Sequence, residues 1–547
     1  MKITPNQLYQ LAVNAHKQGQ WEKVTQLLQP LLKTVPNHEK ALQLMGQVKS
    51  ALLDHEAAEE YLLKSIQLSE NQYNLNMLGI IYMRQDRMLK AIKYFNKALT
   101  YDNQIPEIYN NLAQSNLLVG NALDAINYFQ IALSIRIDAF LISNYLLCLN
   151  YVSFVSPEQV FQSHLQYDSF FSCKPEYKHH THVTKRKIRI GYVAAHFCQN
   201  PIRFFLLPVL KNHDKNNFTI CCYSDTPKED EITDQMKKHV SEWTRTGHMS
   251  HEELASTIYH DNIDILVDIS GHVSGNRLPV FAKQPSKIQF TWLGYPNTTG
   301  LSSMHYRFTD IIADPPENDA YYSEKLIRLS PCFLCYQPEK DSPAVSSLPA
   351  DHKNVITFGS FNNLAKINDS VVRLWSRIMK SLPDTRLLIK AIPLADLDVQ
   401  KYVLNKFRSH GVKNEIQCTG FIKNMQSHLA MYHHVDLALD PFPYNGTTTT
   451  CDALWMGVPV LTRCGKTHAS RVGASLLSCI GLTDFIVHSD DEYVSKVIFL
   501  CQHLDILRDI RKKLRNLCLQ SALMDGARFT RSMETVFRNM VTSHEIF

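Results

Sequence analysis

The sequence lacks the features that mark membrane-spanning, secreted and strongly charged proteins. Its 547 residues contain no run of about 20 apolar residues, and the first of them, Met1 to Asn6, carry no apolar segment typical of a signal peptide. Lys and Arg number 57 against 52 Asp and Glu, so the net charge of +5 is too small to indicate a nucleic-acid-binding protein. We therefore expect a cytoplasmic protein that binds neither membranes nor nucleic acids.

A regular cysteine framework is also absent. The 13 cysteines are scattered over many segments, which indicates reduced thiols rather than disulfides. One Cys-x-x-Cys pair, Cys332 and Cys335, has no second pair to complete a tetrahedral metal site, so we interpret both as buried strand residues. The polar, basic run Tyr177–Lys187 is interpreted as a solvated linker rather than a histidine-rich metal site. Its histidines are His179, His180 and His182. We expect no metal and no cofactor.

The first 140 residues are repetitive, with a period of 33 or 34 residues. Small residues recur where two antiparallel helices would approach closely, and large residues recur where they would fill the gap to the next pair. The repeated positions are Ala12, Gly46, Gly79 and Ala113; Val24, Ala58, Ala91 and Ala125; Leu28, Leu62, Phe95 and Phe129; and Leu31, Ser65, Ala98 and Ala132. This pattern resembles the tetratricopeptide repeat and predicts about four repeats, which form a surface for partner proteins. An unspecialised helical bundle is the alternative.

The rest of the chain is predicted to be a helical connector and linker (141–186) followed by two α/β lobes (187–345 and 346–547). In each lobe, strands alternate with helices, which is typical of parallel sheets whose ligands lie beyond the carboxyl ends of the strands. The expected strands are Ile188–Ala194, Phe218–Tyr223, Ile263–Ile269, Lys287–Leu293, Phe308–Ala313, Lys325–Leu329, Ile356–Ser360, Arg386–Ala391, Glu415–Thr419, Val435–Leu439 and Val458–Thr462. The segment 491–541 is expected to form helices that pack back on either lobe.

A Gly/Thr turn, Tyr444–Asp452, is the most informative stretch. It joins the expected strand Val435–Leu439 to an expected helix, Cys451–Met456. Gly446 allows close approach of the backbone, the four following hydroxyls can contact oxygens, and the N–H groups that open a helix favour an anion. Asp452 can accept hydrogen bonds from a ribose. The turn therefore suggests a nucleoside-diphosphate site, and the alternative is a threonine-rich cap of an ordinary helix.

Other candidate residues also follow strands. Lys366 ends the loop after Ile356–Ser360, where an ammonium group can neutralise a departing diphosphate and the amides of Asn362 and Asn363 can orient it. In the first lobe, glycine-bearing loops after three strands suggest one wall of a site. His196 and His272 in those loops are each either a general base or a hydrogen-bonded structural histidine, and we favour the structural role.

The repeats and these motifs together resemble the O-linked N-acetylglucosamine transferases and their SPINDLY-type relatives, over essentially the whole chain. The resemblance implies two Rossmann-like lobes in the GT-B arrangement. It also implies transfer of a sugar, with inversion and without an essential metal, from a nucleotide donor to Ser or Thr of proteins. The segments that carry it are Ile188–Phe197, Ile263–Arg277, Gln289–Gly300, Ser360–Ile367 and Asp440–Ser475.

By this resemblance, Lys366 contacts the donor diphosphate, Thr448 and Thr449 contact its phosphates, Asp452 binds the ribose and His428 stacks on the base. Asn363 and Thr447 stand where the animal enzymes have Gln and His, as in the bacterial and SPINDLY branches. The donor-binding candidates are Asn363, His428, Gly446, Thr447, Thr448, Thr449 and Asp452.

One departure concerns the first lobe. The family carries a histidine immediately before the position of Pro201, and this chain has Asn200 there. An amide cannot accept a proton near neutral pH, so the proton must pass through water or another group, unless turnover has been lost. The catalytic candidates are Lys366, Asn200 and His272.

The leading interpretation is a protein O-glycosyltransferase that uses UDP-N-acetylglucosamine and holds its acceptor proteins on the repeats. A SPINDLY-type enzyme that uses GDP-fucose is the second interpretation. A catalytically silent scaffold that still binds a nucleotide sugar is the third, and it is motivated by Asn200.

Overall fold

The computed structural model describes residues 3–173, 177–178 and 186–542. The chain forms two compact units, Met1–Ile137 with Ala391–Asn405, and Asp138–Lys390 with Lys406–Phe547. The histidines predicted to lie in a solvated linker, at 179, 180 and 182, fall outside the described residues. No helix in the described part of the chain is both long and apolar enough to span a bilayer.

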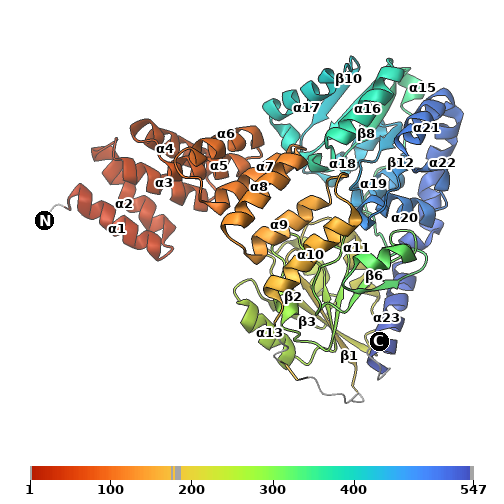
Figure 1. The fold of residues 1–547 in the computed structure, drawn as a ribbon, viewed down its shortest axis with the longest axis horizontal. Helices are drawn as coiled ribbons and strands as arrows, with labels where there is room; N and C mark the ends of the chain where they lie inside the picture. Colours follow the sequence, from red (N-terminus) through yellow and green to blue (C-terminus); the bar gives the residue numbers. More distant parts are fainter. Residues whose placement is uncertain (1–2, 174–176, 179–185, 543–547) are drawn as a thin grey trace. The chain divides into compact units, whose positions relative to one another are not determined.

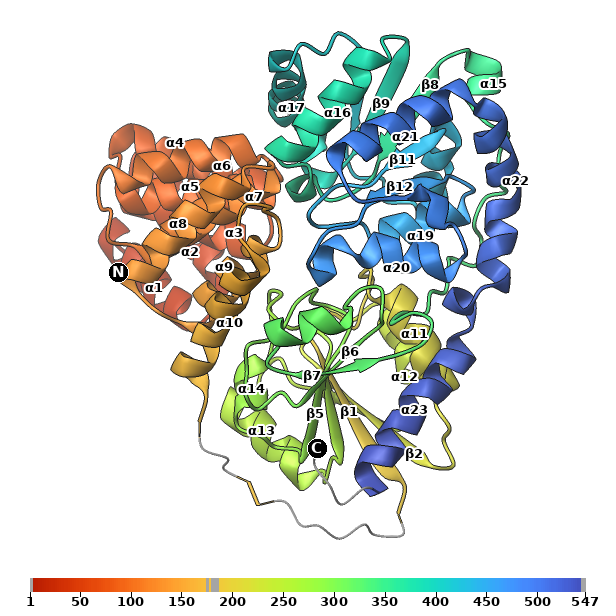
Figure 2. The ribbon, with the colours of Figure 1, turned by 45° about the vertical axis from the view of Figure 1, so that its right-hand side comes forward.

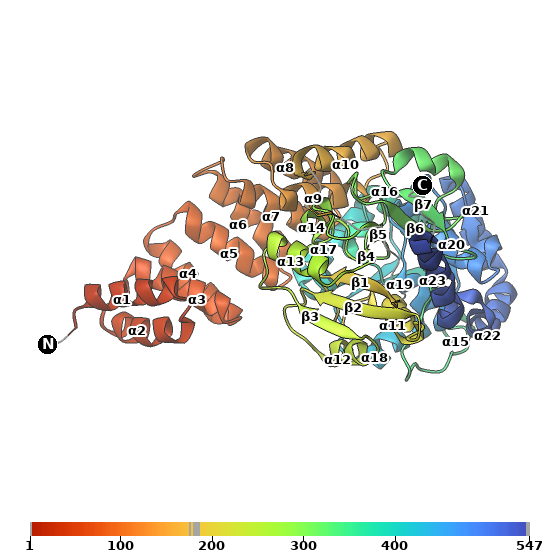
Figure 3. The same ribbon diagram turned by 90° about the horizontal axis from the view of Figure 1, so that it is seen from below.

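The first unit consists mainly of antiparallel helix pairs that follow one another along the chain (Figure 3). Their bounds are α1 (Pro5–Lys17), α2 (Trp21–Thr34), α3 (Glu39–Ala51), α4 (His55–Leu68), α5 (Gln72–Arg84), α6 (Met88–Leu99), α7 (Pro106–Leu118) and α8 (Ala122–Ile135). All sixteen repeated positions are buried. A Cβ on Gly46 would lie 2.6 Å from Leu62 Cγ, and one on Gly79 would lie 2.5 Å from Phe95 Cε1. The predicted close approach of paired helices at the small residues is therefore confirmed, but Leu62 and Phe95 pack against the glycine of their own pair, where the prediction had the large residues filling the gap to the next pair.

The second unit begins with two helices, α9 (Ala139–Leu149) and α10 (Pro157–Phe171), and continues into the first parallel sheet. The strands run in the order β3-β2-β1-β4-β5-β6-β7. Their bounds are β1 (Ile188–Ala194), β2 (Phe218–Ser224), β3 (Glu242–Arg245), β4 (Ile265–Asp268), β5 (Ile288–Thr291), β6 (Tyr306–Thr309) and β7 (Lys325–Arg328). The intervening helices are α11 (Arg203–Asn212), α12 (Glu231–Lys237), α13 (His251–His260) and α14 (Leu278–Ala282).

The second sheet has the strand order β10-β9-β8-β11-β12-β13, and its paired strands are also parallel. Its strands are β8 (Ile356–Ser360), β9 (Thr385–Lys390), β10 (Glu415–Thr419), β11 (Leu437–Leu439), β12 (Val460–Arg463) and β13 (Ile486–Val487). Its helices are α15 (Ala350–Lys353), α16 (Asp369–Ser381), α18 (Met425–Ala430), α19 (Thr448–Trp455) and α20 (Val472–Cys479). Helix α17 (Leu397–Ser409) follows β9 in the sequence, and most of it belongs to the first unit. The two sheets of this unit are seen in Figure 1.

The chain ends in α21 (Asp490–Gln502), α22 (Leu504–Gln520) and α23 (Gly526–Thr542). The last of these returns to the first sheet, where it packs against α11 (Figure 2). Phe529 stacks on Trp292 with ring centroids 5.7 Å apart, and Phe537 meets the edge of Phe290. The C-terminal helix therefore belongs to the core of the first lobe.

Some elements differ from the predicted ones. The expected strand Phe308–Ala313 ends at Thr309, because Asp310 Oδ1 accepts the backbone N–H groups of Ile312 and Ala313 and so turns the chain. Strand β3 was missed because it is a short, polar edge strand, and α11 was missed because Pro208 interrupts a continuous apolar run.

Both sheets reverse their strand order at one point. In the first sheet this point lies between β1 and β4, and in the second it lies between β8 and β11. Loops that leave such a pair of strands diverge and open a crevice at the carboxyl ends, where ligands of α/β sheets bind. The candidate residues near the β1–β4 reversal of the first sheet can therefore be compared with those near the β8–β11 reversal of the second.

Candidate functional site

The crevice of the second sheet is where Lys366 meets the Gly/Thr turn. The Lys366 Nζ atom donates a hydrogen bond to the Asn445 carbonyl over 2.7 Å and lies 4.0 Å from the centroid of the Tyr444 ring. Burial lowers the pKa of Lys366, and the carboxylate of Asp440 partly opposes that change. The predicted proximity of Lys366 to the turn is present in the structure.

Asp440 fixes the shape of the turn. Its Oδ1 accepts the Gly446 N–H over 2.7 Å, and its Oδ2 accepts the Thr462 hydroxyl over 2.6 Å. A Cβ on Gly446 would lie 2.6 Å from Thr449 Oγ1 and 2.9 Å from Asn362 Oδ1. Glycine is therefore required for the polar atoms of this turn to converge.

Helix α19 begins at Thr448, three residues before the predicted start, so the threonines themselves form its first turn. Thr449 Oγ1 donates to Asn362 Oδ1 over 2.8 Å, and Thr450 Oγ1 donates to the Gly446 carbonyl over 3.1 Å. The hydroxyls of Thr447 and Thr448 have no partner among the described residues. Because the first N–H groups of a helix have no intrahelical acceptor, this end of α19 is suited to an anion.

Asp452 lies one turn into α19 and is 4 % exposed. Its Oδ1 accepts the Tyr336 hydroxyl over 2.6 Å, and its Oδ2 lies 3.6 Å from His428 Nε2. The His428 ring meets the edge of Tyr432, with centroids 6.2 Å apart, and Phe361 lies 4.5 Å from Tyr432 by the same measure. Asp452 and His428, which are predicted to bind the ribose and the base, thus lie close together, and His428 contacts the Tyr432 ring.

Two residues near this site, Tyr336 and Lys390, were missed from the sequence, and Asn362 was expected only to orient a ligand. Asn362 binds Thr449, Tyr336 binds Asp452, and Lys390 at the end of β9 lies 5.5 Å from the centroid of the Phe361 ring. Lys390 has a related sequence signal, because it is the last residue of a strand, whereas Lys366 lies in the loop that follows one. Tyr336 has no signal, because it lies in an irregular segment. Asn363 is exposed, and its Oδ1 accepts the Ala365 N–H.

His272 occupies the crevice of the first sheet and is 0 % exposed. Its Nδ1 lies 2.9 Å from Ser143 Oγ and its Nε2 lies 2.8 Å from the Thr299 carbonyl. Because the carbonyl can only accept, Nε2 carries the proton and Nδ1 accepts from the serine. Burial lowers the pKa of His272 to about 3. This geometry favours the structural alternative over the general base.

The glycines of the first-lobe loops also serve packing. A Cβ on Gly271 would lie 2.2 Å from Tyr295 Cβ, and one on Gly300 would lie 2.1 Å from the carbonyl oxygen of His164 in α10. His196 is half-buried. Asn200 accepts the Ile202 N–H over 3.2 Å through its Oδ1, just before α11. The loops of this lobe are therefore organised largely around α9 and α10.

The cysteines are not gathered with other metal-binding side chains in the part of the chain that the structure describes. All 13 cysteines are free thiols. Cys332 and Cys335 are buried as predicted, but they lie in an irregular segment rather than in a strand, because the chain bends there after β7. The described residues contain no group of three or more His, Cys, Asp or Glu side chains that could hold a metal ion.

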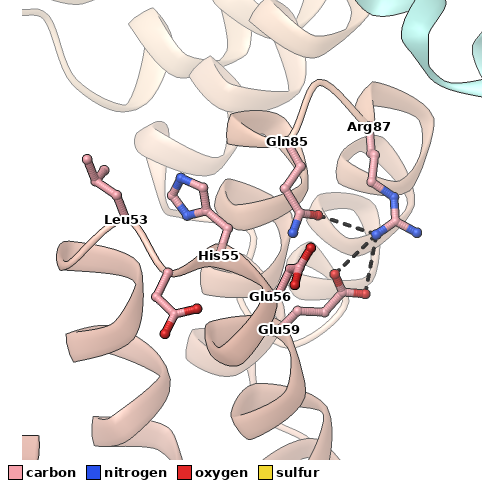
Figure 4. A pocket seen from close by; sticks show the side chains of 7 residues that line it. Leu53, His55, Glu56, Glu59, Gln85 and Arg87 are labelled. Atoms are coloured by element: carbon pink, nitrogen blue, oxygen red, sulfur yellow. Dashed lines mark hydrogen bonds and ion pairs between the residues drawn. The ribbon is translucent and has the colours of Figure 1, made fainter.

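Two pockets lie outside the crevices. One, of about 400 Å³, is formed in the second unit where Phe442 and Pro443 face the loop between α9 and α10. The other, of about 550 Å³, lies in the repeat unit and is lined by Leu53, His55 and Glu56 among others (Figure 4). Neither pocket is lined by Lys366 or by the threonines of the Gly/Thr turn.

Comparisons with known proteins place this geometry in a family. The sequence profile of glycosyl transferase family 41 matches residues 169–340 and 342–533, and that of the tetratricopeptide repeat matches 39–72 and 73–105. The structure of a mutant Thermobaculum terrenum O-GlcNAc transferase is 30% identical, with a TM-score of 0.84 over 92% of this chain and 97% of that one.

Relatives found by sequence comparison also include proteins named as N-acetylglucosaminyltransferases. The probable UDP-N-acetylglucosamine–peptide N-acetylglucosaminyltransferase SPINDLY of Solanum lycopersicum is 36% identical over 405 residues, which are 73% of this chain and 44% of the relative. The corresponding protein SEC of Arabidopsis thaliana is 29% identical over 66% of this chain and 38% of its own length. The chain thus spans less than half the length of these relatives. With tetratricopeptide repeats followed by two Rossmann-like lobes of GT-B type, the chain belongs to glycosyl transferase family 41.

Proposed function

We propose that this protein transfers N-acetylglucosamine from UDP-N-acetylglucosamine to Ser or Thr hydroxyls of other proteins. The observation that carries the proposal is the arrangement after β8 and β11, where Lys366 bonds to the turn that leads into α19 and two threonine hydroxyls have no partner among the described residues. Membership of family 41 and relatives named for this donor support it.

Different residues of the second lobe would bind different parts of the donor. Lys366 and the N-terminus of α19, with Thr447, Thr448 and Thr449, would hold the diphosphate. Asp452 would take the ribose hydroxyls in place of one of its present partners. The base would stack on His428, while Asn363 and Gly446 would shape the loop on either side. All of these residues belong to the lobe of the second sheet, which supports a shared donor site.

The reaction would proceed by direct displacement. The acceptor hydroxyl attacks the anomeric carbon from the first-lobe side, the bond to the diphosphate oxygen breaks, and the anomeric configuration inverts. Negative charge that grows on the diphosphate is stabilised by the Lys366 ammonium and the helix dipole, so the step would need no metal. Preorganised groups of this kind act where the charge develops and require no rearrangement during the step.

The proton of the acceptor hydroxyl needs a separate route. Asn200 cannot accept it, and His272 has both ring nitrogens engaged in hydrogen bonds. We propose that it leaves through water in the crevice. The repeat unit would hold the acceptor protein, because tetratricopeptide arrays commonly bind peptides and partner domains. We propose that the reaction takes place in the cytoplasm.

Transfer to a cell lysate tests the proposal. The full chain is incubated with lysate proteins and either UDP-N-acetylglucosamine or GDP-fucose, and modified Ser and Thr are identified by mass spectrometry. We expect N-acetylhexosamine on proteins only with the uridine donor. Fucose alone would replace the donor assignment with the GDP-fucose alternative. No sugar on any protein, with donor still bound, would support the silent scaffold and contradict the proposal.

A further inference from the structure

Lys390 is a buried cation without a hydrogen-bond or ion-pair partner among the described residues. It is the last residue of β9 and is 7 % exposed. Its Nζ lies 5.5 Å from the centroid of the Phe361 ring, which follows the neighbouring strand β8. Removing an ammonium group from water without a hydrogen-bond partner is costly, so a structural lysine would be expected to have acceptors around it.

A buried structural cation of the same lobe shows what such acceptors look like. Arg511 is 1 % exposed, and its guanidinium donates to the carbonyls of Ser346, Val435 and Tyr432 and to the Ser346 hydroxyl, over 2.7 to 3.2 Å. Within residues 3–173, 177–178 and 186–542, Lys390 has no comparable set of acceptors. Its three N–H donors are therefore not accounted for by the fold itself.

The surroundings of Lys390 point toward one end of the proposed donor. Burial lowers the pKa of Lys390 to about 8, and the nearby Asp452 carboxylate partly opposes this change by favouring the charged ammonium. Phe361 connects it to Tyr432 and through Tyr432 to His428. Lys366 has different neighbours, the Asn445 carbonyl, the Tyr444 ring and Asp440. Lys390 is thus near the residues proposed to bind the ribose and the base, whereas Lys366 is near the turn proposed to bind the diphosphate.

We propose that Lys390 is a second cation of the nucleotide site and donates to an oxygen of the nucleoside monophosphate half of the donor. This inference rests on the proposed function. The acceptor is a base carbonyl, a ribose oxygen or an oxygen of the first phosphate, all of which a uridine or guanosine monophosphate presents near a carboxylate and stacking rings. Lys366, in contrast, acts on the diphosphate as a leaving group.

Comparing the binding of UDP with that of UMP, which lacks the second phosphate, distinguishes the role of Lys390 from that of Lys366. Calorimetry on the full chain measures the binding of UDP and of UMP to the wild type, Lys390→Met, Lys366→Met and the exposed control Lys380→Met. We expect Lys390→Met to weaken both ligands by the same factor, about 10- to 100-fold, because a hydrogen bond from a charged group is lost. Lys366→Met should weaken UDP more than UMP. Lys380→Met should change neither.

The outcomes distinguish the inference from the proposed function. A wild type that binds neither UDP nor GDP would reject the proposed function. A wild type that binds one of them, with Lys390→Met binding as tightly, would overturn the inference alone. A loss for UDP without a loss for UMP would also overturn it, since Lys390 would then act on the second phosphate.

Thermal unfolding provides a second readout that does not require the variant to bind. Removing an unpartnered buried charge should raise the melting temperature of the ligand-free protein in Lys390→Met, while saturating UDP should raise it less than in the wild type. Lys390→Gln, which keeps N–H donors without the charge, should show both effects in smaller degree. A lower melting temperature of both ligand-free variants would show that Lys390 supports the fold and would contradict the inference.

Discussion

The two Rossmann-like sheets have the same reversal of strand order, yet the crevices at the two reversals differ. At the first, His272 is completely buried, with both nitrogens bonded to groups from α9 and from the loop after β5. At the second, Lys366 and the first turn of α19 keep donors that have no acceptor in the described parts of the chain, beyond the bond from Lys366 to the Asn445 carbonyl. The same topology thus provides one crevice that the connector helices fill and one that can hold a ligand.

This difference teaches that strand order locates a possible site, whereas side chains decide its use. Both crevices contain glycines whose replacement would cause close contacts. Gly271 makes room for the Tyr295 side chain, and Gly446 makes room for the hydroxyls of Thr449 and Thr450. The first contact stabilises packing, and the second arranges polar groups. A motif of glycines and polar residues after a strand therefore does not distinguish the two roles.

The largest expected effect follows from removing the cation of the second crevice. Lys366→Met should lower the rate of sugar transfer by about 100- to 1000-fold, because groups that stabilise developing charge contribute on that scale. Transfer is measured with saturating UDP-N-acetylglucosamine and lysate protein. The exposed lysine variant Lys380→Met is the control and should transfer normally. Unchanged turnover in Lys366→Met would show that the leaving-group role is wrong.

Matched glycine variants sharpen the comparison between the crevices. Gly446→Ala should weaken UDP binding by at least about tenfold, because the new methyl group displaces the Thr449 and Thr450 hydroxyls. Gly271→Ala should instead lower the free energy of unfolding by about 1–3 kcal/mol, since it is strained at φ +54° and meets Tyr295. Calorimetry and urea unfolding of both variants test this. If Gly271→Ala weakened UDP binding without lowering stability, the claim that Gly271 serves packing and Gly446 serves binding would be wrong.

The buried histidines of the first lobe predict a stability that depends on pH. Burial lowers the pKa of His272 to about 3 and that of His164 to about 4, against about 6.5 in an unfolded chain. The unfolded state therefore binds more protons between these values, so stability is complete above about pH 6.5 and falls as the pH decreases.

At pH 5 this effect amounts to about 2 kcal/mol for each histidine. Urea unfolding at pH 7.5 and 5.0 measures it, and His272→Asn should lose less stability between the two than the wild type. Equal losses would indicate that His272 titrates normally and is not a buried structural group.

The smallest expected effect concerns Asn200. Its side chain accepts one backbone N–H before α11, so Asn200→Ala should cost about 1 kcal/mol of stability and change the transfer rate by less than about threefold. Initial rates and thermal unfolding test this. A loss of transfer comparable to that of Lys366→Met would place the amide in the reaction and give the first lobe a chemical role of its own.

The sequence allowed the repeats and the Gly/Thr turn to be predicted because both are local patterns. Gly46 and Leu62 lie in consecutive helices, and Gly446 and Thr449 lie in one turn. The start of α19 was placed too late, because threonines are common before a helix as well as in its first turn.

Contacts between distant segments were not predictable in the same way. Tyr336 and Asp452 are separated by 116 residues, and no pattern near Tyr336 indicates that its hydroxyl reaches a carboxylate. The structural role of His272 likewise depends on Ser143 in α9, at a separation of 129 residues. Sequence spacing placed these residues on loops, and the fold then determined which loops meet.

The central claim is that the crevice between β8 and β11 holds a nucleoside diphosphate. Titration calorimetry of the full chain with UDP, and separately with GDP, tests it most directly. The account predicts saturable binding of one nucleotide per chain, strongest for UDP, that is reduced in Lys366→Met and retained in His272→Asn. Absence of binding for both nucleotides to the folded protein would contradict the account.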